Sequence, residues 1–281
     1  MINTDLLNTD EIIATVRVAL DEDIGSGDLT ANLLSDRQAS AELICREDAI
    51  LSGRPWVERS FSLLDASVSL DWQQDEAEQV HSGQVICQIH GPARSILTAE
   101  RTAINFLQTL SGVATTTRRY VDAVAGTGCR ILDTRKTLPG LRKAEKYAVS
   151  CGGGHNHRIG LYDAVLIKEN HIHAAGSVCQ ALERASRSVD PGVLIEIEVE
   201  DLAQLGQAIE CGAKRVLLDN FPVNLLAEAV KLADGRAETE ASGNITLENV
   251  RDVANSGINY VSIGALTKNV RAIDFSLLFT S

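Results

Sequence analysis

From residue 128 onward, the chain alternates short apolar runs with amphipathic stretches, and this rhythm strongly limits its possible folds. The apolar runs are CRILDT, DAVLIKEN, GVLIEIEVE, AKRVLLDNF, AETEASG and INYVSIGA, and helical patterns follow most of them. Near-continuous apolar strands separated by helices are typical of a parallel sheet with both faces covered. Each strand-helix unit takes roughly 22–25 residues, which fits a TIM-type barrel or an open sheet. We favour the barrel.

The N-terminal part of the chain has a different pattern. Residues 9–24 predict a helix capped by Thr9 or Asp10, and ASAELICRE alternates enough to predict a strand. EQVHSGQVICQIHGPA predicts a hairpin that turns at Ser82 and Gly83, and residues 97–125 predict one long helix. This part is therefore expected to be an α+β unit with an antiparallel sheet.

Composition excludes several classes of function. With 26 Lys and Arg against 38 Asp and Glu, the net charge is −12, whereas nucleic-acid binding usually requires a basic face. No apolar run approaches the roughly 20 residues of a membrane helix, and the N-terminus has no secretory pattern. The six cysteines are scattered without CxxC spacing, which predicts free thiols in a reducing cytoplasm. We expect a cytoplasmic protein with neither nucleic-acid nor membrane partners.

Polar residues stand at the end of every predicted strand in the C-terminal part. They are Asp133 to Lys136, Lys168 to Asn170, Glu196 and Glu198, Asp219 and Asn220, Glu240 to Asn244, and Ser262 to Gly264. Barrels place their active sites at the carboxyl ends of the strands. Asp219 or Asn220 alone is better explained as the cap of a following helix, but capping does not explain six strands together. The pattern predicts that a functional site lies at the carboxyl edge of the sheet.

Cations gather in one segment of this acidic chain. Residues 133–171 carry seven Lys or Arg and three His, which favours a pocket for a small polyanion. Part of this charge belongs to a predicted solvated helix, LRKAEKYA. The candidates that stand beside turns or strand ends are Arg135, Lys136, His157, Arg158 and Lys168. Such a set could hold two carboxylates, or one carboxylate and a phosphate.

Acidic groups and glycine-bearing turns complete the candidate site. Glu198 and Asp219 could pair with the cations, bind sugar hydroxyls or hold Mg²⁺, which prefers oxygen ligands. The turns at 242–244 and 262–265 follow the last two strands, where barrels commonly bind phosphate through backbone N–H groups. The HxH pairs 155/157 and 171/173 leave a zinc site open as the weaker alternative, because zinc would need a third ligand.

Several long segments resemble quinolinate phosphoribosyltransferases, the carboxylating nicotinate-nucleotide pyrophosphorylases. They are EDIGSGDLT, ERTAINFLQTLSGVATTT, DTRKTLPGLRKAEKYAV, GGGHNHRIGLYDAVLIKENHI, IEIEVE, LLDNF, ASGNI and YVSIGALT. The resemblance runs through most of the chain, with no departure at the motif positions.

The resemblance implies a type II phosphoribosyltransferase of the α/β class. Residues 1–112 would form an N-terminal α/β sandwich and residues 113–269 an incomplete TIM-like α/β barrel, with the tail 270–281 able to pack back on the sandwich. The enzyme would convert quinolinate and phosphoribosyl pyrophosphate to nicotinate mononucleotide, pyrophosphate and CO₂ in de novo NAD biosynthesis, with Mg²⁺ as cofactor. It would be a homodimer with shared active sites, or a higher oligomer.

The resemblance also implies a role for each candidate residue. The catalytic set would be Lys168, Glu198 and Asp219, and the last two would hold the ribose and Mg²⁺. The quinolinate carboxylates would meet Arg135, His157, Arg158 and Lys168, with Thr134 and Lys136 in the same pocket and Arg101 reaching in from the partner subunit. The 5′-phosphate would meet Ser242, Gly243, Asn244, Ile263, Gly264 and Ala265.

Two alternatives stay open at this point. A related transferase of the same architecture could act on another nitrogen heterocycle, and a non-catalytic barrel could sense a sugar phosphate. The complete set of cations favours a dicarboxylate, because a monocarboxylate would need fewer positive groups.

Overall fold

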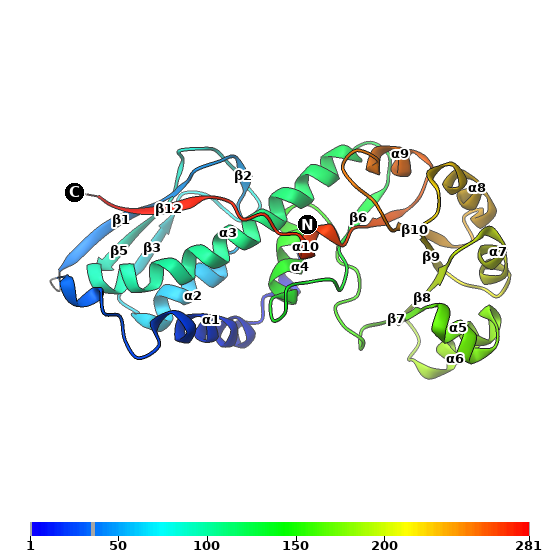
Figure 1. The fold of residues 1–281 in the computed structure, drawn as a ribbon, viewed down its shortest axis with the longest axis horizontal. Coiled ribbons are helices and arrows are strands. Elements are labelled where there is room, and N and C mark those ends of the chain that lie inside the picture. The colour runs from blue at the N-terminus through cyan, green and yellow to red at the C-terminus, as the bar shows by residue number, and fades with distance from the viewer. Residues whose placement is uncertain (1, 35–36, 281) are drawn as a thin grey trace. The chain divides into compact units, whose positions relative to one another are not determined.

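A computed structural model describes residues 2–34 and 37–280 of the chain (Figure 1). The chain forms two compact units. The first contains Met1–Arg118, Thr137–Gly153 and Ala265–Ser281, and the second contains Arg119–Lys136 and Gly154–Gly264. Neither unit is one continuous stretch of sequence, because a middle segment and the C-terminal segment belong to the first unit.

The first unit is built on a four-stranded antiparallel sheet in the order β12-β1-β5-β3. These strands are β1 (Gln38–Cys45), β3 (Ser69–Trp72), β5 (Val85–Pro92) and β12 (Phe275–Thr280). The C-terminal strand β12 pairs with β1, with Leu277 opposite Leu43. A smaller sheet joins β2 (Ala49–Ile50) to β4 (Gln79–Val80).

The hairpin expected at Ser82 and Gly83 is wrong. The flanking strands β4 and β5 belong to different sheets, since β4 pairs with β2 while β5 pairs with β1 and β3. Gly83 nevertheless makes a turn, with φ +83°. Local alternation predicts that two strands flank a turn, but it does not specify their partners.

Helices were expected at residues 9–24, at residues 97–125 and around LRKAEKYA, and the structure has them, but two further helices of the first unit were not expected. The helices of this unit are α1 (Thr9–Ile24), α2 (Arg54–Leu64), α3 (Ala93–Ala123, which runs on into the second unit), α4 (Arg142–Cys151) and α10 (Ala265–Lys268), with 3₁₀ turns at Thr4–Leu6 and Ala31–Leu33. The expectation that LRKAEKYA is a solvated helix is wrong for Glu145 and Lys146, which are fully buried.

The cap of α1 is Asn8, not Thr9 or Asp10. Asn8 has an extended backbone, and its side chain accepts hydrogen bonds from the N–H groups of Asp10 and Glu11.

Two helices cover one face of the four-stranded sheet and close the first core. Val57 and Phe61 of α2 and Leu107 of α3 lie in the same buried cluster as Leu43 and Ile89 of the strands. Their burial removes large apolar side chains from water, which is the main stabilising contribution of such a core. The first unit therefore has a hydrophobic core of its own.

A partly buried carboxylate supports the start of α2. Oε1 of Glu76 accepts hydrogen bonds from the N–H groups of Gly53 at 2.8 Å and Arg54 at 2.6 Å. Burial raises the pKa of Glu76. The first N–H groups of a helix have no partner within the helix, so Glu76 supplies one from the loop before β4.

The second unit contains a six-stranded parallel sheet in the order β6-β11-β10-β9-β8-β7. All six expected strands are present: β6 (Arg130–Leu132), β7 (Ala164–Ile167), β8 (Leu194–Val199), β9 (Arg215–Asp219), β10 (Glu238–Ser242) and β11 (Tyr260–Ser262). Among the described residues, the outer strands β6 and β7 do not pair with each other. The sheet is thus an open α/β barrel, as expected.

Helices alternate with the strands of the second unit (Figure 1). They are α5 (Glu169–Ala175), α6 (Val178–Ser188), α7 (Leu202–Glu210), α8 (Val223–Ala233) and α9 (Val250–Asn255). The short helix α5 was not expected from the sequence. None of the helices in the described ranges is both long and apolar enough to span a membrane.

The prediction of six free thiols is wrong for two cysteines. Cys179 in α6 and Cys211 at the end of α7 form a disulfide, with their Cα atoms 5.3 Å apart. The two helices are neighbours in the fold, which brings together residues that are 32 positions apart in the chain. The other four, Cys45, Cys87, Cys129 and Cys151, are free and buried.

The strand register brings the polar strand ends to one edge of the sheet. Asp219 lies opposite Ser242, Ser242 opposite Ser262, and Ser262 opposite Leu132. Side chains alternate between faces along a strand, so Glu196 and Glu198 share one face of β8. By the same alternation, Arg215 and Asp219 share a face of β9, and Glu240 and Ser242 share a face of β10.

Candidate active site

The carboxyl edge of the barrel carries an acid–base pair at its β7–β8 side. Lys168 directly follows β7, and its Nζ forms an ion pair with Glu198 Oε2 on the neighbouring strand β8. The side chain of Lys168 is 48% exposed and that of Glu198 is 16% exposed, so a ligand can reach both. Two residues expected to share a site therefore do meet in the structure.

A second part of the edge concentrates positive charge. Burial lowers the pKa of the Arg158 guanidinium, and the charge of Arg135 lowers it further. Arg158 Nη1 donates a 3.2 Å hydrogen bond to the carbonyl of Ala164, which holds the side chain in place. Two guanidinium groups whose charges repel each other form a site that a bound anion would stabilise.

The turn after β6 packs against the turn after β11. The Thr134 hydroxyl accepts a 3.0 Å hydrogen bond from the Lys136 N–H, and this bond tightens the β6 turn. A Cβ atom at Gly264 would lie 3.0 Å from Cδ of Lys136. Glycine at position 264 therefore leaves room for the lysine stem across the end of the sheet.

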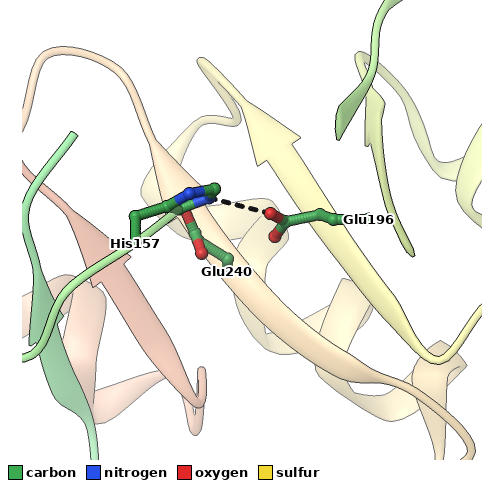
Figure 2. Close-up of side chains that lie close together, drawn as sticks. All are labelled: His157, Glu196 and Glu240. Atoms are coloured by element: carbon green, nitrogen blue, oxygen red, sulfur yellow. Dashed lines mark hydrogen bonds and ion pairs between the residues drawn. The ribbon is translucent and has the colours of Figure 1, made fainter. Parts of the chain in front are cut away.

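A buried network lies beneath this edge (Figure 2). His157 Nε2 lies 2.8 Å from Glu196 Oε2 and 3.6 Å from Glu240 Oε1. Arg215 closes the network, with Nη2 2.8 Å from Glu240 and Nε 3.3 Å from Glu196. The guanidinium carbon of Arg215 also lies 3.9 Å from the ring centre of Tyr260, a cation–π contact.

The charges of this network are strongly coupled. Burial and repulsion by Glu196 raise the pKa of Glu240 to about 7. Burial also opposes ionisation of Glu196, but the hydrogen bond from His157 and the charge of Arg215 outweigh it, and the pKa of Glu196 is lowered. Nδ1 of His157 accepts a 2.7 Å hydrogen bond from the Arg158 N–H, so the neutral ring carries its proton on Nε2, facing Glu196.

The geometry of His157, Glu196 and Glu240 would also suit a metal ion. Within residues 2–34 and 37–280, it is the one cluster of three or more His, Cys, Asp or Glu side chains close enough together to hold one. Arg215 contacts both carboxylates and opposes a second cation at the same place. We therefore interpret the group as an ion-pair network. The HxH alternative gains no support from it, because the two acids come from β8 and β10 and His155 is not a member.

Two further charged residues shape the site in ways that the sequence pattern did not reveal. The fully buried carboxylate of Asp133 accepts hydrogen bonds from the His157 N–H at 2.9 Å and from Asn156 Nδ2 at 2.7 Å. Asp133 thereby holds residues 155–158 beside β6. Arg215 stands at the start of the apolar strand RVLLD. A charged residue in an apolar strand usually has a buried partner of opposite charge, and this was the one signal in the sequence for the role of Arg215.

The expected phosphate-binding residues lie at the ends of β10 and β11. Ser242 ends β10, and Gly243 and Asn244 follow with φ +100° and +51°. The N–H of Ile263 donates to the carbonyl of Leu132 at 3.0 Å, so it belongs to the sheet. Gly264 ends the second unit.

Two expected site residues lie in the first unit. Arg101 is exposed on α3, and Ala265 begins α10. The remaining expected residues all lie in the second unit, at or beneath the carboxyl edge of its sheet.

Comparisons with known proteins agree with this architecture over nearly the whole chain. The model of the quinolinate phosphoribosyl transferase N-terminal domain matches residues 28–111, and that of the C-terminal domain matches residues 113–278. The probable carboxylating nicotinate-nucleotide pyrophosphorylase of Bacillus subtilis is 42% identical over 257 residues, covering 91% of this chain and 89% of its own. A decarboxylating quinolinate phosphoribosyltransferase of Nicotiana tabacum is 40% identical over 290 residues, covering 96% and 82%.

A solved structure shows the same fold. The nicotinate-nucleotide pyrophosphorylase of Francisella tularensis superposes with a TM-score of 0.95 at 43% identity, covering 98% of each chain. Matches to both domains and to full-length relatives confirm the resemblance found in the sequence. This chain belongs to the quinolinate phosphoribosyltransferase family.

Proposed function

We infer that this chain transfers the phosphoribosyl group of phosphoribosyl pyrophosphate to the ring nitrogen of quinolinate. The products are nicotinate mononucleotide, pyrophosphate and CO₂, and the reaction serves NAD biosynthesis. Membership of the family along both domains carries this inference. The arrangement of cations and acids along one edge of the barrel supports it, because the two substrates are polyanions.

Quinolinate would bind at the cationic part of the edge. Arg135 and Arg158 are close enough for one charge to lower the pKa of the other, and a dicarboxylate would relieve that repulsion. Lys136 and Thr134 border the same turn, and Lys168 stands at the end of β7. His157 would act differently from these residues. Its ring nitrogens engage Glu196 and the Arg158 backbone, so it would hold the Arg158 segment in place.

The ribose would bind between Glu198 and Asp219. Both carboxylates stand at strand ends and present oxygen ligands, which fit Mg²⁺ bound largely through the substrate. When bound, Mg²⁺ would neutralise charge on the leaving pyrophosphate. The turn Ser242–Asn244 would receive the 5′-phosphate through backbone N–H groups, together with the Ile263, Gly264 and Ala265 turn.

The chain's own residues would act mainly through position and charge. Departure of pyrophosphate leaves positive charge on the ribose ring, which nearby carboxylates such as Glu198 and Asp219 can stabilise. Loss of the carboxyl group next to the ring nitrogen as CO₂ leaves a carbanion, which the positive pyridinium ring stabilises until a proton from solvent takes the place of the carboxyl group. Lys168 would exchange its contact with Glu198 for a substrate carboxylate, linking the two binding regions.

We also propose a homodimer with shared sites, or a higher oligomer built from it. Arg101 supports this proposal because it is exposed on α3 in the first unit, whereas the other cations of the site lie in the second. A location in the cytoplasm is proposed from the four free buried cysteines, and the bond between Cys179 and Cys211 is a feature that a reducing compartment does not favour.

A direct assay tests the proposed activity. The purified chain is incubated with quinolinate, phosphoribosyl pyrophosphate and Mg²⁺, and CO₂ and nicotinate mononucleotide are measured. We expect both products in equal amounts, and neither when phosphoribosyl pyrophosphate is omitted. Binding of phosphoribosyl pyrophosphate without turnover of any pyridine carboxylate would favour a sugar-phosphate sensor instead.

A further inference from the structure

Asn220 occupies an unusual position directly after β9. Its backbone has φ +53°, in the left-handed region that favours glycine and that asparagine tolerates better than most residues. Its N–H donates a 2.8 Å hydrogen bond to the carbonyl of Ser242, which ties the end of β9 to the end of β10. A helix-capping role does not account for this residue, because the N-cap of α8 is Pro222.

The side chain of Asn220 bridges two parts of the candidate site. Its Nδ2 donates to Asp219 Oδ2 at 2.9 Å, and its Oδ1 accepts from Asn244 Nδ2 at 3.2 Å. A carboxylate can only accept, so the amide nitrogen must face Asp219 and the amide oxygen must face Asn244. A carboxamide meets both requirements, whereas a carboxylate or an apolar side chain of the same size does not.

The turn that Asn220 contacts is itself fixed from the other side. Asn244 has a left-handed backbone with φ +51°, and its carbonyl accepts a 3.0 Å hydrogen bond from Asn249 Nδ2. Asn249 Oδ1 in turn accepts from the Thr246 N–H at 2.9 Å. Three amide side chains thus connect Asp219 to the residue that precedes α9.

Gly243 shows how closely the amide of Asn220 approaches the turn. A Cβ atom at position 243 would lie 2.1 Å from Oδ1 and 2.7 Å from Cγ of Asn220. The side chain therefore lies directly against the backbone that would surround a phosphate. A side chain at position 243 would therefore displace the amide of Asn220.

We propose that Asn220 is a positioning residue that holds the Asp219 carboxylate and the turn Ser242–Asn244 in one fixed relation, so that a phosphorylated ribose is bound by its hydroxyls and its phosphate together. The proposal rests on the proposed function and deepens it. Asn220 contacts the binding groups and is not itself assigned a contact with substrate. The competing explanation is that Asn220 only fills a left-handed backbone position.

Asn220→Gly separates these two explanations. Glycine adopts the left-handed backbone freely, so a purely structural role would be preserved, whereas the amide bridge would be lost. We expect the affinity for ribose 5-phosphate and for phosphoribosyl pyrophosphate, measured by calorimetry, to fall roughly tenfold, corresponding to the loss of two hydrogen bonds. The affinity for quinolinate alone should not change, and the preference for ribose 5-phosphate over ribose should shrink.

A matched control comes from Asp234, which also has a left-handed backbone, with φ +48°, but lies at the C-cap of α8. Asp234→Gly should bind every probe as wild type does. Asn220→Asp provides a second variant: it keeps the shape and tolerates the same backbone, but it loses the donor to Asp219. We expect it to weaken ribose 5-phosphate binding at least as much.

A coupling measurement completes the test. In wild type, the effects of Asp219→Asn and Ser242→Ala on ribose 5-phosphate affinity should be non-additive, and in the Asn220→Gly background they should become additive. Wild-type affinity for ribose 5-phosphate in either folded Asn220 variant would overturn the proposal. If wild type itself binds neither ribose 5-phosphate nor phosphoribosyl pyrophosphate, the proposed function fails instead.

Discussion

Nε2 of His157 lies 2.8 Å from Oε2 of Glu196, a carboxylate whose side chain is only 1% exposed. The imidazole is therefore held from the barrel interior by an acid that solvent cannot reach. Glu240 and Arg215 extend this contact, so the segment that carries Arg158 rests on a buried ion-pair network. The cation region at the carboxyl edge depends on charges one layer below it.

The first prediction concerns the cost of ionising Glu240. Its pKa is raised to about 7 in the folded chain, so the folded state holds this proton more tightly than the unfolded state does. The resulting contribution to stability is complete below the unfolded value near 4.5 and is lost as the pH rises through about 7. Glu240→Gln removes that dependence.

Between pH 5 and pH 8, we expect the free energy of unfolding of wild type to fall relative to that of Glu240→Gln, by at most on the order of 3 kcal/mol. Urea unfolding at several pH values measures the difference. Glu228→Gln, which alters an exposed carboxyl group on α8, is the matched control and should follow wild type. If the free energy of unfolding changed with pH in the same way in wild type and in Glu240→Gln, the raised pKa of Glu240 would be contradicted.

The second prediction concerns the start of α2. Glu76→Ala removes the acceptor of the Gly53 and Arg54 N–H groups, and we expect it to lower the free energy of unfolding by about 1–3 kcal/mol. Glu76→Gln keeps an oxygen in that place and should lose much less. Glu58→Ala, which removes an exposed carboxyl group on α2 itself, serves as the control and should cost little. Equal losses in the alanine and glutamine variants would show that charge, and not hydrogen bonding, supports the helix.

The strands of the barrel and its functional edge were predictable because both depend on local pattern. Apolar runs such as AKRVLLD predict a buried strand that ends at a polar residue, and the carboxyl ends of parallel strands meet at one edge of a sheet. The structure then pairs Asp219 with Ser242 at that edge. Partner choice depends on distant parts of the chain. For that reason the sequence did not predict that β4 would pair with β2, or that Cys179 would meet Cys211.

The same reason limits what could be predicted about the site. The cations of the edge were recognisable because they stand beside turns or strand ends in a chain of net charge −12. The partners of His157 come from β8 and β10, which lie about 40 and 80 residues further along the chain, so its orientation toward Glu196 needed the fold. Asn220 was recognisable only as a polar strand end, because its bridging role depends on a turn that belongs to the next strand.

The third prediction tests whether active sites are shared between subunits. Lys168→Ala should keep the fold and lose most turnover, since Lys168 stands at the site and is not needed by the core. Arg101→Ala should also be inactive. After subunit exchange in an equal mixture, half of the dimers would be hybrids with one intact site each, giving about a quarter of wild-type activity.

Exchange is verified with differently tagged subunits, and each variant mixed with itself is the control. Sites built from one subunit would give no recovery in the verified hybrid, because each chain would still lack one essential residue. That outcome would contradict the proposed contribution of Arg101 to the partner's site.

The last prediction concerns the choice between quinolinate and nicotinate. Arg135, Arg158 and Lys168 carry more positive charge than one carboxylate can neutralise, and burial already lowers the pKa of Arg158. Nicotinate would leave one desolvated cation unpaired, at a cost of about 2–5 kcal/mol. This corresponds to a preference for quinolinate of roughly 30- to 5,000-fold in kcat/KM.

Steady-state kinetics with both acids at saturating phosphoribosyl pyrophosphate and Mg²⁺ measures this preference. Arg135→Gln should narrow it, because removing one positive charge harms the dicarboxylate more than the monocarboxylate. Arg142→Gln, a change of the same kind on α4 outside the proposed quinolinate pocket, is the matched control and should leave the ratio unchanged. Equal kcat/KM values for the two acids in wild type would show that the cation region does not recognise the second carboxylate, and a related transferase for another heterocycle would then be the better assignment.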